Sequence, residues 1–275
     1  MSRRYLKIFK TKPITLSLGV TVSTGFQNNK RNKALSLDQL GVQHRTDKAS
    51  TLLTSGHHTS GHNYLVKYDH FLEHLKLRKD VDILELGAGE GERMGASVKV
   101  WAEYFPLSNP IHVAEINPEA RTLKTDRIVP RIGDLSDSRF LDKLSEAQWD
   151  LIIDDASHHW DHQIQALESL FDSVKPGGVY IVEDINTSFD KYRASYVGLP
   201  DADSRDRSAR DRSDAMTILS EIAYYVSGDG LYHPLLELST NLSLVEMIGS
   251  RVESITFIKG SAILVKSNCD GTYLS

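Results

Sequence analysis

From Val81 onward, short apolar runs alternate with amphipathic stretches of helical length, and this alternation restricts the fold more than any other feature of the sequence. Strands that alternate with helices along a chain form a mostly parallel sheet with helices on both faces. The expected strands are Val81–Gly87, Ile111–Asn117, Ile128–Gly133, Leu151–Asp155, Gly178–Ile185, Ser254–Ile258 and Ala262–Lys266. The expected helices are Glu92–Tyr104, Pro118–Thr125, Ser138–Ser145, His159–Val174 and Asp214–Tyr225. The pattern predicts a doubly wound α/β fold with a mostly parallel, seven-stranded sheet.

The chain before this pattern differs in composition. The first 37 residues contain eight lysines and arginines and no acidic residue, which favours a basic arm over residues 1–39, although a transit peptide has the same composition. Residues 40–80 are polar and rich in histidine, and they end in a helical stretch. Its apolar side chains fall on one face: Leu65, Tyr68, Phe71, Leu72 and Leu75. We therefore expect a helical cap or lid over residues 40–80.

Charge and cysteine content restrict the partners and the compartment. The net charge of −5 at pH 7 disfavours a nucleic-acid partner. The single cysteine, Cys269, is typical of a reducing compartment, and no apolar run reaches the roughly 20 residues that span a bilayer. We expect a cytoplasmic protein without nucleic-acid or membrane partners. Because symmetric dimers are common, a homodimer or higher homo-oligomer is the default expectation.

A glycine-rich turn, Glu85–Gly91, follows the first predicted strand. Its glycines permit a tight turn and a close approach of the backbone to a ligand. In doubly wound folds, ligands bind outside the carboxyl ends of the strands, where this turn lies. Glu90 and Glu92 occupy the place where a pyrophosphate requires exposed backbone amides, so an anionic dinucleotide is disfavoured.

Acidic residues end the next two predicted strands. Glu115 lies where the hydroxyls of a ribose would bind, and Asp134 could accept a hydrogen bond from an adenine amino group. Each alone could instead be a helix cap. Their succession after the glycine turn favours a cofactor that contains a nucleoside.

The run Ile83–Gly91, together with Glu115 and Asp134, resembles the cofactor site of class I S-adenosylmethionine methyltransferases. The resemblance implies that the glycine turn holds the methionine part of the cofactor, that Glu115 binds the ribose hydroxyls and that Asp134 faces the adenine. The last two predicted strands resemble the reversed C-terminal hairpin of that fold. The domain over residues 81–275 is accordingly expected to bind S-adenosylmethionine.

Acidic side chains also follow the fourth and fifth predicted strands. If these strands are neighbours, about 4.8 Å apart, then Asp155, Glu183 and Asp184 crowd one small volume. Three carboxylates repel one another unless a cation or a proton joins them, and oxygen ligands favour Mg²⁺ or Ca²⁺. His158 would lie beside that ion. Alternatively, Asp155 or Ser157 caps the following helix and the other acids are solvated.

Several separate motifs resemble the macrolide-sugar O-methyltransferases of the mycinamicin and tylosin pathways. They are Thr46–Ser50 with His62 and Tyr64, Gly133–Asp137, Asp154–His158, Leu170–Gly178 and Val182–Ser188. The resemblance implies that Asp155, Glu183 and Asp184 bind Mg²⁺ and that His158 is the general base. The cofactor-binding residues that it implies are Glu85, Gly87, Gly89, Glu115, Asp134, Asp154, Thr46, Lys48 and Tyr64.

We therefore expect an O-methyltransferase of a small-molecule natural product, with metal assistance and a histidine base at a hydroxyl acceptor. Carboxyl methylation of a small acid remains an alternative, because an ionised carboxylate needs a cationic anchor and no base. Cations for that purpose follow the fifth strand: Lys191, Arg193, Arg205, Arg207, Arg210 and Arg212. The glycine turn also permits an NAD-dependent oxidoreductase, but the acidic triad and the C-terminal hairpin do not fit one. A non-catalytic regulator with the same fold is the third hypothesis.

Overall fold

The computed structural model describes residues 35–54, 57–189, 214–231, 236–237, 239 and 241–268. These residues belong to one compact unit, which begins at Leu35. The predicted basic arm lies almost entirely outside the described residues, and so do the basic side chains of residues 190–213 and Cys269. In the described part of the chain, no helix is both long and apolar enough to cross a membrane.

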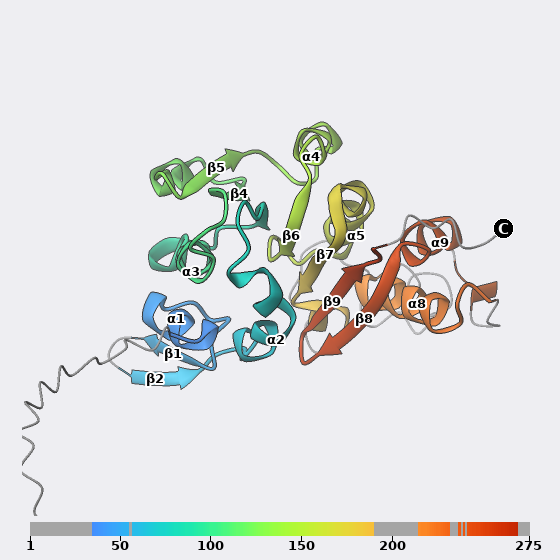
Figure 1. Ribbon diagram of the computed structural model, residues 1–275, viewed down its shortest axis with the longest axis horizontal. Coiled ribbons are helices and arrows are strands. Elements are labelled where there is room, and N and C mark those ends of the chain that lie inside the picture. The colour runs from blue at the N-terminus through green and yellow to red at the C-terminus, as the bar shows by residue number, and fades with distance from the viewer. Residues whose placement is uncertain are drawn as a thin grey trace, which may run out of the picture. The chain divides into compact units, whose positions relative to one another are not determined.

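The core of this unit is a seven-stranded sheet with the strand order β5-β4-β3-β6-β7-β9-β8 (Figure 1). Strands β3 to β7 are parallel, and β9 runs antiparallel to both of its neighbours. The order reverses between β3 and β6, which creates the switch point where doubly wound folds bind ligands. The mostly parallel sheet predicted from the sequence is confirmed. Its strands are β3 (Ile83–Leu86), β4 (Ile111–Glu115), β5 (Ile128–Ile132), β6 (Trp149–Asp154), β7 (Val174–Glu183), β8 (Val252–Ile258) and β9 (Ser261–Lys266).

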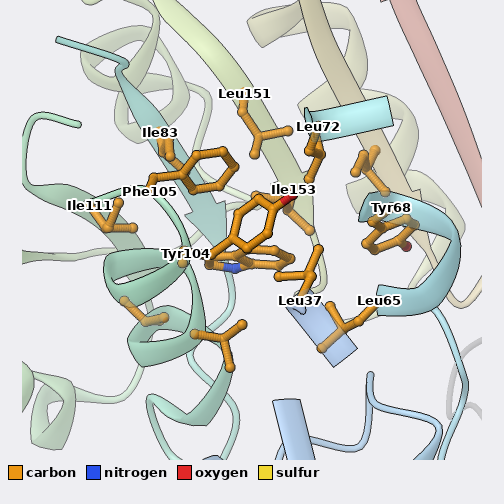
Figure 2. Packing of buried hydrophobic residues seen from close by; sticks show 14 of the residues in the cluster. Leu37, Leu65, Tyr68, Leu72, Ile83, Tyr104, Phe105, Ile111, Leu151 and Ile153 are labelled. Carbon is orange, nitrogen blue, oxygen red and sulfur yellow. The ribbon is translucent and has the colours of Figure 1, made fainter. Parts of the chain in front are cut away.

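Helices cover both faces of the sheet. Strand β6 shows the two layers, because Leu151 and Ile153 join one buried cluster while Ile152 joins the other, as the two-residue period of a strand requires. The first cluster holds side chains of α1, α2 and α3, among them Leu37 of α1, Leu65 of α2 and Tyr104 of α3 (Figure 2). The second holds side chains of α4, α5, α8 and α9. These helices are α1 (Leu37–His44), α2 (Leu65–Lys76), α3 (Ala96–Tyr104), α4 (Ser138–Ser145), α5 (Trp160–Leu170), α8 (Ala215–Ser227) and α9 (Leu242–Gly249).

The segment before the sheet consists of α1, the hairpin β1 (Thr51–Thr54) and β2 (His57–Ser60), and α2. Ser36 caps α1 through a reciprocal pair of hydrogen bonds with Gln39. The apolar face predicted for α2 is buried, since Leu65, Tyr68, Leu72 and Leu75 are all inaccessible. Helices α1 and α2 share the cluster of α3, so this segment packs as part of the core (Figure 2).

Glycines and prolines account for the shifted element ends. The helix expected over Glu92–Tyr104 is divided by Gly95, whose φ of 74° interrupts it, so that a 3₁₀ turn precedes α3. The helix expected from Pro118 is a 3₁₀ helix, Pro118–Leu123. Strand β7 begins at Val174, four residues before the predicted Gly178, because a register shift in its pairing with β6 accommodates the turn-forming residues 176–177.

Among the described α-helices and strands, four were not predicted: α1, β1, β2 and α9. The sequences of α1 and of the hairpin are polar, and their apolar periods are too short to indicate an element on their own. The apolar sequence of α9 has the length at which periodicity does not distinguish helix from strand.

Candidate active site

A cavity of about 430 Å³ lies at the carboxyl ends of the parallel strands. Residues that follow β3, β4, β5, β6 and β7 line it, together with residues of the segment before the sheet. The lining residues are Thr46, Asp47, His62, Gly87, Ala88, Gly89, Glu90, Arg93, Ala96, Ser97, Ala114, Glu115, Ile116, Gly133, Asp134, Leu135, Asp155, Ala156, Ser157, His158, His162 and Asp184. The cavity therefore occupies the position that the sequence predicts for a ligand.

The glycine turn after β3 lines the cavity and contacts the end of β6. Gly87 has a φ of 90°, and a Cβ atom there would collide with the carbonyl group of Asp155. Gly89 also has a left-handed backbone, with a φ of 70°. Glycine at position 87 thus allows the ends of the two central strands to meet beside the cavity.

Glu115 and Asp134 are held in place by backbone amides. The two carboxylate oxygens of Glu115 accept hydrogen bonds from the amides of Ala88 and Asn117, both at 2.8 Å. Asp134 accepts from the amide of Ser136 at 2.8 Å, and this bond lowers the pKa of the Asp134 carboxyl. Each carboxylate oxygen can accept more than one hydrogen bond, so both groups retain acceptor capacity toward the cavity.

An acidic cluster with a histidine lies where β6 and β7 end. Among the described residues, Asp155, His158 and Asp184 offer ligand atoms that all lie within 4.8 Å of one another. Nε2 of His158 is 3.4 Å from Oδ2 of Asp184. Both residues have left-handed backbones, with φ values of 56° and 53°. Such conformations are uncommon outside glycine and gather at functional sites.

Glu183 is not a member of this compact cluster. It is 1% exposed, and its carboxylate accepts a hydrogen bond from Nζ of Lys48. Nζ also lies 2.5 Å from Oδ2 of Asp155 and 3.7 Å from Oε1 of Glu85. The structure thus places Asp155 and Asp184 together as predicted, while His158 rather than Glu183 is the third member of the compact cluster.

Burial and charge perturb the ionisation of these groups. Burial alone would lower the pKa of Lys48, but the charges of Asp155, Glu183 and Glu85 together raise it well above its usual value. Burial raises the pKa of Glu85 to about 7, even though Lys48 lowers it. Burial likewise raises the pKa of Glu183, against the opposing effect of Lys48. The pKa of Asp154 is raised to about 7, again mainly by burial. We assign Lys48 as protonated and positively charged, because its ammonium contacts three carboxylates at once.

The segment before the sheet contributes one wall of the site. The hydroxyl of Tyr64 donates to Oδ1 of Asp184 at 2.7 Å, and Nδ1 of His62 lies 3.7 Å from the same oxygen. Burial and the charge of Asp184 raise the pKa of Tyr64, so its hydroxyl remains a donor. Asp47 pairs with Arg93, which follows the glycine turn.

The predicted site residues fall into two groups. Those that line the cavity are Thr46, Gly87, Gly89, Glu115, Asp134, Asp155, His158 and Asp184. Those that lie behind its wall are Glu85, Lys48, Tyr64, Asp154 and Glu183, all of them at most 3% exposed. Arg93 and His162 also line the cavity, although neither was predicted as a site residue. Their positions, two residues after Gly91 and one helical turn after His158, were signals that could have identified them.

Comparison with known proteins shows what the chain resembles. No known family model matches it. It is 32% identical over 158 residues to the 8-demethyl-8-(2-methoxy-alpha-L-rhamnosyl)-tetracenomycin-C 3'-O-methyltransferase of Streptomyces olivaceus, a match that covers 56% of this chain and 37% of that protein. It is 31% identical over 142 residues to the mycinamicin VI 2''-O-methyltransferase of Micromonospora griseorubida, covering 46% of this chain and 33% of that protein. The matches thus span about a third of the length of these curated relatives.

A solved structure shares the fold. The MycE methyltransferase from the mycinamycin biosynthetic pathway, in complex with Mg, SAH and mycinamycin VI, superposes with a TM-score of 0.65 at 22% identity, covering 88% of this chain and 58% of that one. The protein therefore has the fold of class I methyltransferases. Within that class, it resembles the macrolide- and sugar-directed O-methyltransferases, as its sequence motifs predict.

Proposed function

We propose that this protein transfers a methyl group from S-adenosylmethionine to a hydroxyl of a glycosylated small-molecule natural product, with the help of a divalent ion. The observation that carries the proposal is the single cavity that joins the glycine turn, Glu115 and Asp134 to the cluster of Asp155, His158 and Asp184. The named activities of the relatives, sugar O-methylation in particular, agree with this arrangement.

The charge of the cavity fits a cationic cofactor. Among the described lining residues, six are acidic and Arg93 is the one lysine or arginine. A sulfonium cofactor suits such a surface, whereas the pyrophosphate of NAD would be repelled. In this proposal, Glu115 accepts hydrogen bonds from the ribose hydroxyls and Asp134 from the adenine amino group.

The acidic cluster fits a hard divalent ion. Asp155 and Asp184 would hold it, and the second oxygen of Glu183, Oε1, is buried without a hydrogen-bond partner among the described residues, so it is available as a third ligand. Carboxylate oxygens completed by water are the usual ligands of Mg²⁺. MycE was solved with Mg and SAH. When bound, the ion would supply a Lewis acid that makes an acceptor hydroxyl more acidic.

Residues of this protein would orient the cofactor and take the proton of the acceptor. The glycine turn and Glu115 would position the sulfonium for an in-line displacement, which is chiefly a matter of orientation. Nε2 of His158, which faces the cluster, would take the proton of the hydroxyl, and the charge of Asp184 would stabilise the resulting imidazolium. A carboxylate acceptor is less compatible with this cavity, because the acidic lining would repel it.

Calorimetry and a transfer assay test the proposal. We expect S-adenosylhomocysteine to bind and NAD⁺ not to bind. We also expect labelled methyl transfer from S-adenosylmethionine to rhamnosylated acceptors, lost on addition of EDTA and restored by Mg²⁺. Binding of NAD⁺ in place of S-adenosylhomocysteine would refute the cofactor assignment. Transfer to carboxylate acceptors alone would refute the hydroxyl assignment.

A further inference from the structure

Lys48 is the most deeply buried cation in the described part of the chain, with 1% of its surface exposed. Its ammonium contacts carboxylates from three parallel strands: Glu85 within β3, Asp155 just after β6 and Glu183 at the end of β7. Among the described residues, no other lysine or arginine lies within 4.0 Å of these three carboxylates. One positive charge therefore serves three acids in a buried volume.

The position of this lysine is fixed by the backbone around it. The carbonyl of Lys48 accepts hydrogen bonds from the amides of Tyr64 and Leu65, at 2.8 and 3.2 Å, where α2 begins. Leu65 is fully buried in the cluster of α1, α2 and α3. The ammonium is thus held against the acids by a packed segment rather than by a flexible surface chain.

Lys48 does not line the cavity, so contact with the cofactor does not account for it. Its three carboxylate partners explain better why a lysine is buried at this position. A buried charge without a partner is costly, and three carboxylates without a cation would repel one another at the junction of β3, β6 and β7. Asp155 contacts the ammonium and is also a member of the cluster that we propose to bind the metal ion.

We propose that Lys48 is the internal counter-ion of the metal site: its ammonium neutralises the Asp155 and Glu183 carboxylates when no divalent ion is bound, and it lowers the affinity for that ion when one binds. The metal part of this inference rests on the proposed function. The counter-ion part rests on the contacts of the lysine alone. Lys48 acts through its neighbours and is a positioning residue, not a catalytic one.

The test replaces the lysine with a side chain of similar length and no charge. In EDTA, Lys48→Met is expected to melt below the wild type, because the buried Glu85 and Glu183 and the half-buried Asp155 lose their cation. Saturating Mg²⁺ should raise its melting temperature by more than it raises that of the wild type, by about 3 °C or more. Titration with Mn²⁺, followed by electron paramagnetic resonance of the free ion, should give an affinity at least about tenfold tighter than that of the wild type.

Two further variants serve as controls. Lys99→Met removes an exposed lysine on α3 and should change neither quantity. Lys48→Met combined with Glu85→Gln removes one charge of each sign, and it should recover much of the stability in EDTA. If Lys48→Met alone does not fold in EDTA, its rescue by Mg²⁺ or by Glu85→Gln supports the inference, and failure of both rescues overturns it.

Other outcomes also overturn the inference. Unchanged stability of Lys48→Met in EDTA refutes the counter-ion role. A folded variant that binds Mn²⁺ equally or more weakly refutes the competition between lysine and metal. A wild type that binds no divalent ion contradicts the metal in the proposed function, while the comparison in EDTA still decides whether Lys48 is the counter-ion.

Discussion

The hydroxyl of Tyr64 donates a hydrogen bond of 2.7 Å to Oδ1 of Asp184, across 120 residues of sequence. Tyr64 is the residue immediately before α2, and Asp184 follows β7 with a left-handed backbone. This contact fixes the orientation of a carboxylate that we propose as a metal ligand. The segment before the sheet thus determines the geometry of a site whose acids come from the sheet.

Tyr64→Phe removes this hydrogen bond and leaves the ring in place. We expect a loss of about 1.5–3 kcal/mol in the free energy of unfolding, the usual effect of deleting a bond to a charged group, together with weaker Mn²⁺ binding. Urea denaturation and metal titration measure the two effects. Tyr104→Phe is the matched control, because it removes a tyrosine hydrogen bond to the carboxylate of Asp69, and neither residue lines the cavity. Weaker metal binding in both variants would show that the effect is not specific to Asp184.

Glu115→Ala tests the cofactor site. Its carboxylate is fixed by two backbone amides beside the glycine turn. We expect the affinity for S-adenosylhomocysteine to fall by about 1.5–3 kcal/mol, measured by calorimetry. Glu119→Ala, an exposed acid on the following 3₁₀ helix, should bind like the wild type. Unchanged affinity in Glu115→Ala would contradict its assignment to the ribose.

His158→Ala separates the two acceptor classes. If the acceptor is a hydroxyl, removal of the base should lower turnover about 10²- to 10⁴-fold and leave binding of S-adenosylhomocysteine intact. Exposed His74→Ala on α2 is the control. A variant that keeps near-normal turnover, in an enzyme that EDTA does not inhibit, would instead favour a carboxylate acceptor.

Acid sensitivity of the fold is expected from His112 on β4. Burial lowers the pKa of its imidazole, and Arg131, whose Nε donates to Nδ1 at 3.2 Å, lowers it further. The unfolded state, with a pKa of about 6.5, therefore binds more protons than the folded state, so stability rises with pH. The contribution of His112 is complete above about pH 6.5 and is lost as the pH falls through that value toward the pKa of the folded state.

His112→Asn should consequently lose less free energy of unfolding than the wild type between pH 7.5 and pH 5.5, a range set around that pKa. Urea denaturation at several pH values measures the difference. His74→Asn, at an exposed position, should keep the dependence of the wild type. Parallel pH profiles for the wild type and His112→Asn would contradict the assignment.

Sequence patterns predicted the positions of those site residues that lie at the ends of strands. Glu115, Asp134 and Asp155 could be assigned to one edge, because parallel strands bring their carboxyl ends together. Glu85 was expected to bind the cofactor, yet it lies one strand period from Ile83 and shares its face, which packs against the segment before the sheet. The two-residue period of a strand could have predicted the face of the sheet on which the side chain of Glu85 lies.

The contacts of Lys48 could not be predicted in the same way. They join positions up to 135 residues apart, through a segment whose hairpin has no clear sequence signal. The contact of Glu183 with that lysine depends on tertiary packing, which the motifs around the two residues do not reveal. Propensity and spacing describe an element and its neighbours along the chain, whereas this part of the site is made by elements that lie far apart in the sequence.

The long separation between Lys48 and Glu183 also has a consequence for synthesis on the ribosome. The lysine emerges with α1 and α2, whereas β7, which carries Glu183, is translated after four other strands of the sheet. A nascent chain that ends just after Asp155 therefore contains the lysine without Glu183, and it lacks Asp184 for Tyr64. Because domains fold as units and the amino-terminal parts emerge first, the acidic site is completed only when β7 joins the sheet.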